Sequence, residues 1–307
     1  MRKGFLLIVV LVLATGYLQA QSIPIANPSF EEPALADGGY NFVIPNWTIT
    51  GGVAGVWNPS VAQSSAAFVA GIPDGDQVGY SNAGDLEQST GVTLQPGYRY
   101  VLKVSIGGRP GAYSGRDYAL ILAGDTPLNT TTGTNVANEW FEQTVIYNSP
   151  IDDSREGEEI KVQLVNNEGG QLNFDQVTLD AMTCEGFLPP FDKPLTLKKK
   201  ENRAIPVKMV LRDLLGNDIT DADLSAPPVV QVSVGGDSGS AIDGYNGDLL
   251  PAGLSDDGNE FRYDWATEQW IINLATKQYT SALLYNVTVF VDGNVIKGGC
   301  SQTFTRQ

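Results

Sequence analysis

The stretch NPSFEE, residues 27–32, follows a hydrophobic N-terminus and places an aromatic residue beside two carboxylates. We expect it to form the first strand of a β-sandwich. Its expected partner is NFDQV, residues 173–177, far along the chain on the last strand of the same domain. In that second stretch the alternation of apolar and polar side chains shifts between Phe174 and Val177, which predicts a bulge or kink at Asp175.

The rest of the first half has the pattern of an all-β domain. In YRYVLKVSI, residues 98–106, the Tyr, Leu, Val and Ile side chains share one face, while Arg, Lys and Ser mark the other. Glycine and proline are frequent, and no long amphipathic helix pattern follows the N-terminus. About eight strand candidates over residues 21–183 predict a two-sheet jelly roll.

The second half has a similar pattern. Ile, Val, Met and Leu alternate cleanly through residues 205–211, and further strand candidates fill residues 204–307. Their number fits an immunoglobulin-like β-sandwich. Residues 184–203 contain two adjacent prolines and are expected to be a junction that also begins this second domain.

The N-terminus predicts export. Two basic residues precede a short apolar run, and small residues follow up to Ala20. This is the pattern of a signal peptide over residues 1–20. We therefore expect a secreted, extracellular protein that could associate with a cell surface, with no transmembrane segment in the mature chain.

Composition narrows the function classes. The chain has no histidine, which removes Ser-His-Asp triads, Cys-His dyads and histidine zinc sites. The net charge of −16 argues against a nucleic-acid partner and suits Ca²⁺. The two cysteines, Cys184 and Cys300, are expected to form a disulfide in an exported chain, although two free thiols are the alternative.

Four motifs occur in the same order as in a known family of domains. NPSFE at 27–31, PNWT at 45–48, PDG at 73–75 and LNFDQVTL at 172–179 resemble the galactose-binding-like jelly rolls of carbohydrate-binding modules over residues 22–182. The second half resembles the bacterial extracellular domain with the Pro-x-Lys-Phe (PxKF) motif, an immunoglobulin-like module. The matching segments are FLPPF at 187–191, AIPVKMVL at 204–211, FRYD at 261–264 and QWIINL at 269–274, with Met209 in place of the usual Phe.

The resemblance implies a structural Ca²⁺ between the first and last strands, held by Glu31 and Asp175. Carboxylate and carbonyl oxygens are the ligands that Ca²⁺ prefers. Two alternatives stay open at these positions: a catalytic carboxylate pair, as in glycoside hydrolysis, or side chains that simply face solvent.

Aromatic and arginine side chains suggest a ligand-binding surface in the jelly roll. Sugar-binding faces combine exposed aromatic rings with hydrogen-bonding side chains. The candidate residues are Trp57, Tyr80, Arg109, Tyr113 and Arg116. The alternative is that Trp57 and Tyr80 belong to the core and Tyr113 to an ordinary loop.

These observations favour a secreted, non-catalytic binding or adhesion protein that recognises a glycan or another cell-surface component through the jelly roll. A structural cell-surface or matrix subunit capable of self-assembly is the second hypothesis. A carboxylate-dependent hydrolase is third, because no nucleophile or histidine base is apparent.

Overall fold

The computed structural model describes residues 22–113, 116–134, 138–166, 170–198, 204–234, 258–276, 279, 283–296 and 298–307. The expected signal peptide lies outside the described residues. Strands dominate, so the all-β expectation is confirmed. The first part contains β1 Tyr40–Asn41, β2 Thr48–Trp57, α1 Val61–Ala67, β3 Val78–Thr93, β4 Arg99–Tyr113, β5 Arg116–Ala123, β6 Thr126–Thr134, β7 Trp140–Asn148, β8 Glu159–Asn166 and β9 Gly170–Phe187. The second contains β10 Leu195–Leu197, β11 Ala204–Arg212, β12 Val229–Val234, β13 Arg262–Asp264, β14 Gln269–Ala275, β15 Leu284–Val291, β16 Asn294–Val295 and β17 Ser301–Arg306.

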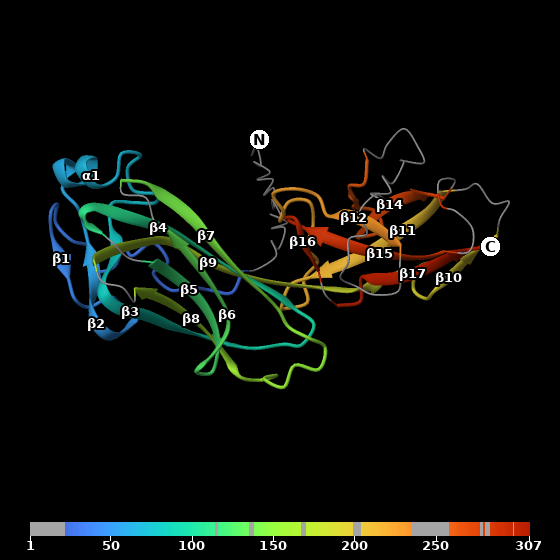
Figure 1. Ribbon diagram of the computed structural model, residues 1–307, viewed down its shortest axis with the longest axis horizontal. Coiled ribbons are helices and arrows are strands. Elements are labelled where there is room, and N and C mark those ends of the chain that lie inside the picture. The colour runs from blue at the N-terminus through green and yellow to red at the C-terminus, as the bar shows by residue number, and fades with distance from the viewer. Residues whose placement is uncertain are drawn as a thin grey trace, which may run out of the picture.

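The first part is a β-sandwich of the jelly-roll class, at the left of Figure 1. Antiparallel β4 lies between β7 and β9, while β3 pairs with β2, β8 and β9, and β5 joins β8 to β6. The alternation predicted for residues 98–106 is confirmed, because Tyr100, Leu102, Val104 and Ile106 are fully buried in the core.

Residues 27–32 do not form a strand, which corrects our first expectation. Asn27 and Phe30 have φ angles of 49° and 59°, in the left-handed region that strands do not use. The Asn27 amide closes the turn, since its oxygen accepts from the Glu32 N–H (3.0 Å) and its nitrogen donates to the Glu32 carbonyl (2.8 Å). The turn still lies beside β9, because Val177 N–H donates to the Pro28 carbonyl (3.0 Å).

The predicted bulge at Asp175 is confirmed. The pairing of β4 with β9 shifts register between Lys103 and Ser105, opposite Thr178 and Asp175. Gln176 has a φ of 50°, which places one residue outside the regular ladder. The bulge turns the Asp175 side chain toward the loop of residues 73–77.

The second part is also a two-layer β-sandwich. One layer has the order β13-β14-β11-β9, and the other has β10-β17-β15-β12 with β16 on β15. The predicted alternation over residues 205–211 is confirmed by a buried face on β11. The Cys184–Cys300 disulfide is present, with a Cα–Cα distance of 5.6 Å, inside this core. The PxKF and immunoglobulin-like assignments stay predictions.

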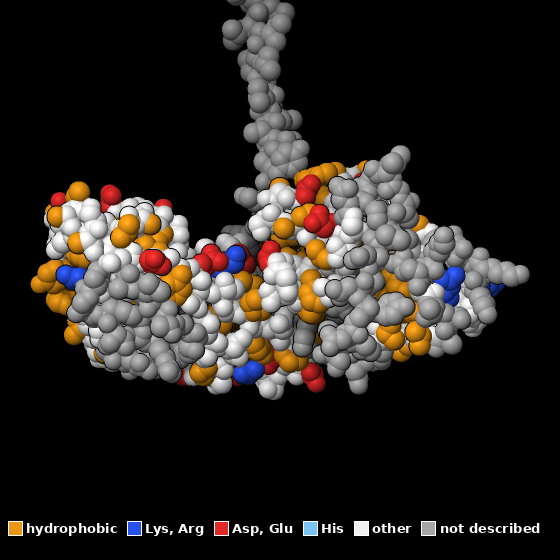
Figure 2. Space-filling model, turned by 45° about the horizontal axis from the view of Figure 1, so that its top comes forward, with side chains coloured by type: hydrophobic (Ala, Val, Ile, Leu, Met, Phe, Trp, Pro, Cys, Tyr) orange, Lys and Arg blue, Asp and Glu red, His pale blue; other side chains and the backbone are white. Residues whose placement is uncertain are grey.

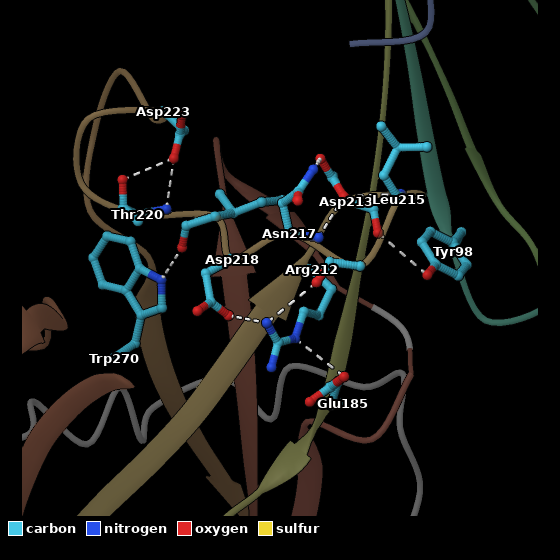
Figure 3. Close-up of polar contacts among 12 residues, drawn as sticks. Tyr98, Glu185, Arg212, Asp213, Leu215, Asn217, Asp218, Thr220, Asp223 and Trp270 are labelled. Carbon is cyan, nitrogen blue, oxygen red and sulfur yellow. Dashed lines mark hydrogen bonds and ion pairs between the residues drawn. The ribbon is translucent and has the colours of Figure 1, made fainter. Parts of the chain in front are cut away.

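The two sandwiches share β9, which pairs with β4 in the jelly roll and with β11 in the second sandwich. Arg99 at the start of β4 is 1% exposed, and its guanidinium donates to the Val291 carbonyl (2.7 Å) and the Asn294 carbonyl (3.3 Å) across the junction. Nearby, Arg212 lies between Glu185 and Asp218 (Figure 3).

Turns rich in aspartate follow β11 in the second sandwich. Asp213 accepts backbone hydrogen bonds from Leu215 (2.9 Å) and Asn217 (2.8 Å), while Asp223 accepts from Thr220 (Figure 3). Turn chemistry explains these acids. None of the helices among the described residues is long and apolar enough to cross a membrane.

Candidate functional site

The loop of residues 73–77, before β3, is held by side chains from the N-terminal turn. Glu31 Oε1 accepts from the backbone N–H groups of Asp76 (3.0 Å) and Gln77 (2.8 Å). Ser29 Oγ donates to Asp74 Oδ2 (2.6 Å). A Cβ on Gly75 would lie 2.3 Å from Glu31 Oε1, so only glycine lets the loop lie this close.

Asp175 lies beneath this loop and is fully buried. Its Oδ2 accepts from the Asp74 N–H (2.9 Å) and its Oδ1 from the Gln176 N–H (2.8 Å). Burial raises the pKa of Asp175 to about 7; the two N–H groups oppose this, and the charges of Asp74 and Glu31 add to it. Asp175 therefore retains a proton at a pH where ordinary aspartates are ionised.

The hydrogen bonds of Glu31 and Asp175 occupy oxygens that the predicted calcium site would need. Ca²⁺ takes six to eight oxygen ligands. Both oxygens of Asp175 and one of Glu31 already accept backbone hydrogen bonds. Within the described ranges, no group of three or more His, Cys, Asp or Glu side chains is placed to hold a metal ion. The structure thus shows a hydrogen-bonded clasp, and calcium at Glu31 and Asp175 stays a prediction.

A pocket of about 240 Å³ adjoins the clasp, and we call it pocket 1. Pro73 and Ser105, both in its wall, are the neighbours of Asp175: Pro73 precedes Asp74, and Ser105 pairs with Asp175 across the strands. Gln176 bridges the two, accepting from Ser105 Oγ (3.1 Å) and donating to the Pro73 carbonyl (3.2 Å). The other wall residues are Ala70, Gly71, Ile72, Trp140, Phe141 and Glu142.

Trp140, at the start of β7, is the largest side chain in the wall of this pocket. It is only partly buried, and its ring packs tilted by 35° against Phe68 with 4.7 Å between the ring centroids, while its indole N–H is buried without a hydrogen-bond partner. An unpaired buried donor in a pocket wall is costly unless a ligand or water accepts from it. Trp140 therefore gives the pocket an apolar wall segment.

The predicted ligand-binding residues are spread over this end of the jelly roll. Trp57 and Tyr80 are buried, with 6% and 5% exposure, in a small cluster with Phe68. The Arg109 guanidinium lies 5.2 Å over the Trp57 ring. Tyr113 ends β4 and Arg116 begins β5, but their side chains lie outside the described residues.

Sequence reasoning missed helix α1, which it treated as irregular chain. Ser60 caps the helix, accepting from Gln63 N–H, while Gln63 Oε1 accepts from Ser60 N–H (2.9 Å). This capping box was readable as Ser-x-x-Gln. Figure 2 shows hydrophobic side chains at the same end of the molecule, where Tyr40 and Phe42 on and beside β1 are 64% and 56% exposed.

A family comparison matches residues 21–180, the jelly roll, to the HpiC1-like model, described as HpiC1 cyclase. The chain belongs to the HpiC1-like family. Among curated proteins no significant relative was found.

Solved structures similar to this HpiC1-like chain include the Stig cyclase Fisc from Fischerella sp. TAU, in complex with an indole compound. It is 26% identical, with a TM-score of 0.47, over 53% of this chain and 98% of that one. TmCBM61 in complex with β-1,4-galactotriose is 19% identical, with a TM-score of 0.35 and coverages of 52% and 98%. The CBM22-1 xylan-binding domain of Xyn10C from Paenibacillus barcinonensis is 11% identical, with a TM-score of 0.30 and coverages of 48% and 96%.

Family membership corrects one expectation. The sequence led us to expect a protein that is not an enzyme, but the HpiC1-like family is described by its cyclase, and the match overturns that expectation. The absence of histidine and of an apparent nucleophile does not exclude acid catalysis. A buried carboxylic acid can transfer a proton without either.

Proposed function

We propose that this protein is a cyclase in which Asp175 supplies the proton that starts ring closure of an apolar substrate bound in pocket 1. The proposal is carried by one observation: a fully buried carboxyl group, whose pKa is raised to about 7, directly behind the wall of a pocket lined by Trp140 and Phe141. A general acid works best when its pKa is near the operating pH.

The proposed reaction is an isomerisation. Protonated Asp175 gives its proton to a carbon–carbon double bond of the substrate, which leaves a carbocation. A second π bond of the same molecule attacks this cation and closes the ring. The new cation then loses a proton to the Asp175 carboxylate, so no atom is gained or lost and the acid is regenerated.

The pocket supports each step through its own residues. Phe141 contributes an aromatic ring to the pocket wall, and such a ring can stabilise a nearby cation because aromatic faces carry negative potential. The loop of residues 73–77 covers Asp175 through the Asp74 N–H, so the proposed proton transfer requires this loop to shift.

A variant comparison tests the proposal. Purified protein is incubated in D₂O with a panel of acyclic polyenes and alkenyl-substituted aromatic compounds, and mass spectrometry detects isomers that carry one deuterium. Asp175→Asn should lower the rate at least 10²-fold, the usual contribution of a general acid. Asp180→Asn is the matched control, because Asp180 lies on the same strand and burial also raises its pKa. Equal rates for wild type and Asp175→Asn would remove Asp175 from the mechanism.

Glycan recognition, which the sequence suggested, has less support from the site. Stacking on sugars needs exposed aromatic faces, whereas Trp57 and Tyr80 are buried. It stays a prediction that a glycan array can test.

A further inference from the structure

A second pocket of about 350 Å³ lies beside helix α1 at the same end of the jelly roll, and we call it pocket 2. Its wall consists of Ala62, Gln63, Ala66 and Ala67 from α1 and of Arg109 from β4. The lining thus consists of three alanine methyl groups, the Gln63 side chain and one cation. Its volume is within the range of small-molecule sites.

Arg109 is held in place from two sides. Its guanidinium lies over the Trp57 ring at 5.2 Å, and Nη1 donates to the Oε1 atom of the buried Gln171 (3.0 Å). A guanidinium has five N–H donors. Stacking and this single bond leave donors of Arg109 available to the pocket.

No carboxylate neutralises Arg109 in the part of the chain that the structure describes. Three other arginines have such partners: Arg99 lies 3.9 Å from Asp292, Arg155 lies 3.4 Å from Asp153, and Arg212 pairs with Glu185 and Asp218. This is unusual in a chain with 35 acidic and 19 basic residues. A preorganised, half-buried cation without an acid partner is well suited to an external anion.

The two pockets are connected by one apolar cluster. Ala67 belongs both to pocket 2 and to the cluster of Trp57 and Phe68, while Trp140 and Ile72 pack on that cluster and line pocket 1. The walls of the two pockets therefore pack on the same buried cluster.

We propose that pocket 2 is a second binding site, which takes the anionic group of an amphipathic organic acid, a carboxylate or sulfonate with an apolar body. A single guanidinium beside three alanine methyl groups and the Gln63 side chain fits a monoanion with a hydrophobic body better than it fits inorganic phosphate, which would require more charged donors.

Two fluorescent dyes test the charge selectivity without turnover. The sulfonate dye 1-anilinonaphthalene-8-sulfonate carries the anion, and N-phenyl-1-naphthylamine is the same ring system without it. Titration of the full chain should show that Arg109→Gln weakens binding of the sulfonate dye at least about tenfold. Binding of the neutral dye should change less than twofold. Lys208→Gln removes the same charge from the second sandwich and should change neither.

Two further variants keep the test decisive. Arg109→Lys retains the cation and should preserve most of the preference for the sulfonate dye, which excludes a folding defect at this position. Ala66→Phe fills pocket 2 and should weaken both dyes. The inference is overturned if Arg109→Gln changes neither dye or weakens both equally. Asp175→Asn should bind both dyes like wild type. Loss of turnover in Asp175→Asn therefore tests the proposed acid, whereas the dye selectivity of the Arg109 variants tests pocket 2.

Discussion

Replacing Asp175 with asparagine should remove one defined part of the pH dependence of stability. Burial raises the pKa of Asp175 from 3.8 to about 7. Between these values the folded chain holds a proton that the unfolded chain has released. The stability from the protonated carboxyl is therefore complete below about pH 3.8 and is lost as the pH rises through 7.

The magnitude follows from the size of the pKa shift. At 1.36 kcal/mol per unit, a shift of about three units corresponds to roughly 4 kcal/mol over the whole window. Between pH 5 and pH 8 the integrated loss for this group is about 3 kcal/mol. The Asp175→Asn variant cannot titrate at this position, so its free energy of unfolding should lack this decrease.

Urea unfolding at pH 5, 6, 7 and 8 measures the difference between wild type and Asp175→Asn. Asp37→Asn is a suitable control, because Asp37 is exposed. Titration of the ¹³C-labelled aspartate carboxyl groups by NMR reads the pKa of Asp175 directly. Parallel stability profiles for wild type and Asp175→Asn would refute the inference that this acid is protonated at neutral pH.

Three other predictions concern the disulfide, the junction and the metal. Cys184 and Cys300 are 116 residues apart, so replacing both with serine should lower the free energy of unfolding by about 5 kcal/mol, and an unchanged urea midpoint would contradict this. Arg99→Met leaves the buried Val291 carbonyl without its donor and should cost about 3 kcal/mol in the same assay; wild-type stability would show that the junction does not depend on this contact. For calcium, metal binding and a protonated Asp175 exclude each other, because Ca²⁺ requires the carboxylate: binding heats that Glu31→Ala reduces would indicate an ionised, metal-bound Asp175, whereas identical heats, or melting unaffected by a chelator, would remove the predicted site.

Local patterns in the sequence predicted much of the fold. Alternation with a period of two identified the buried faces over residues 98–106 and 205–211, because each side chain's direction in a strand is set by its own backbone. The shift in the alternation of apolar and polar side chains at Asp175 predicted the bulge, because the alternation also follows the local backbone. The cysteine pair was predicted from its number and from the expected export.

What sequence reasoning missed depends on contacts between distant residues. The turn at residues 27–32 requires the Asn27 amide to bracket Glu32. The pKa of Asp175 depends on a loop 101 residues earlier that folds over it, and no local pattern reports such burial. Helix α1 had a readable capping box but only seven residues, too few for a clear helical period.

The shared strand β9 gives the protein a mechanical property. Its backbone continues without a break from Asp180, which pairs with β4, to Cys184, which pairs with β11. A pull on the second sandwich would load the β4–β9 hydrogen bonds in shear, so that many bonds would resist at once instead of opening one by one. The two sandwiches should therefore resist tension as one rigid unit, in contrast to domains that are joined by a flexible linker.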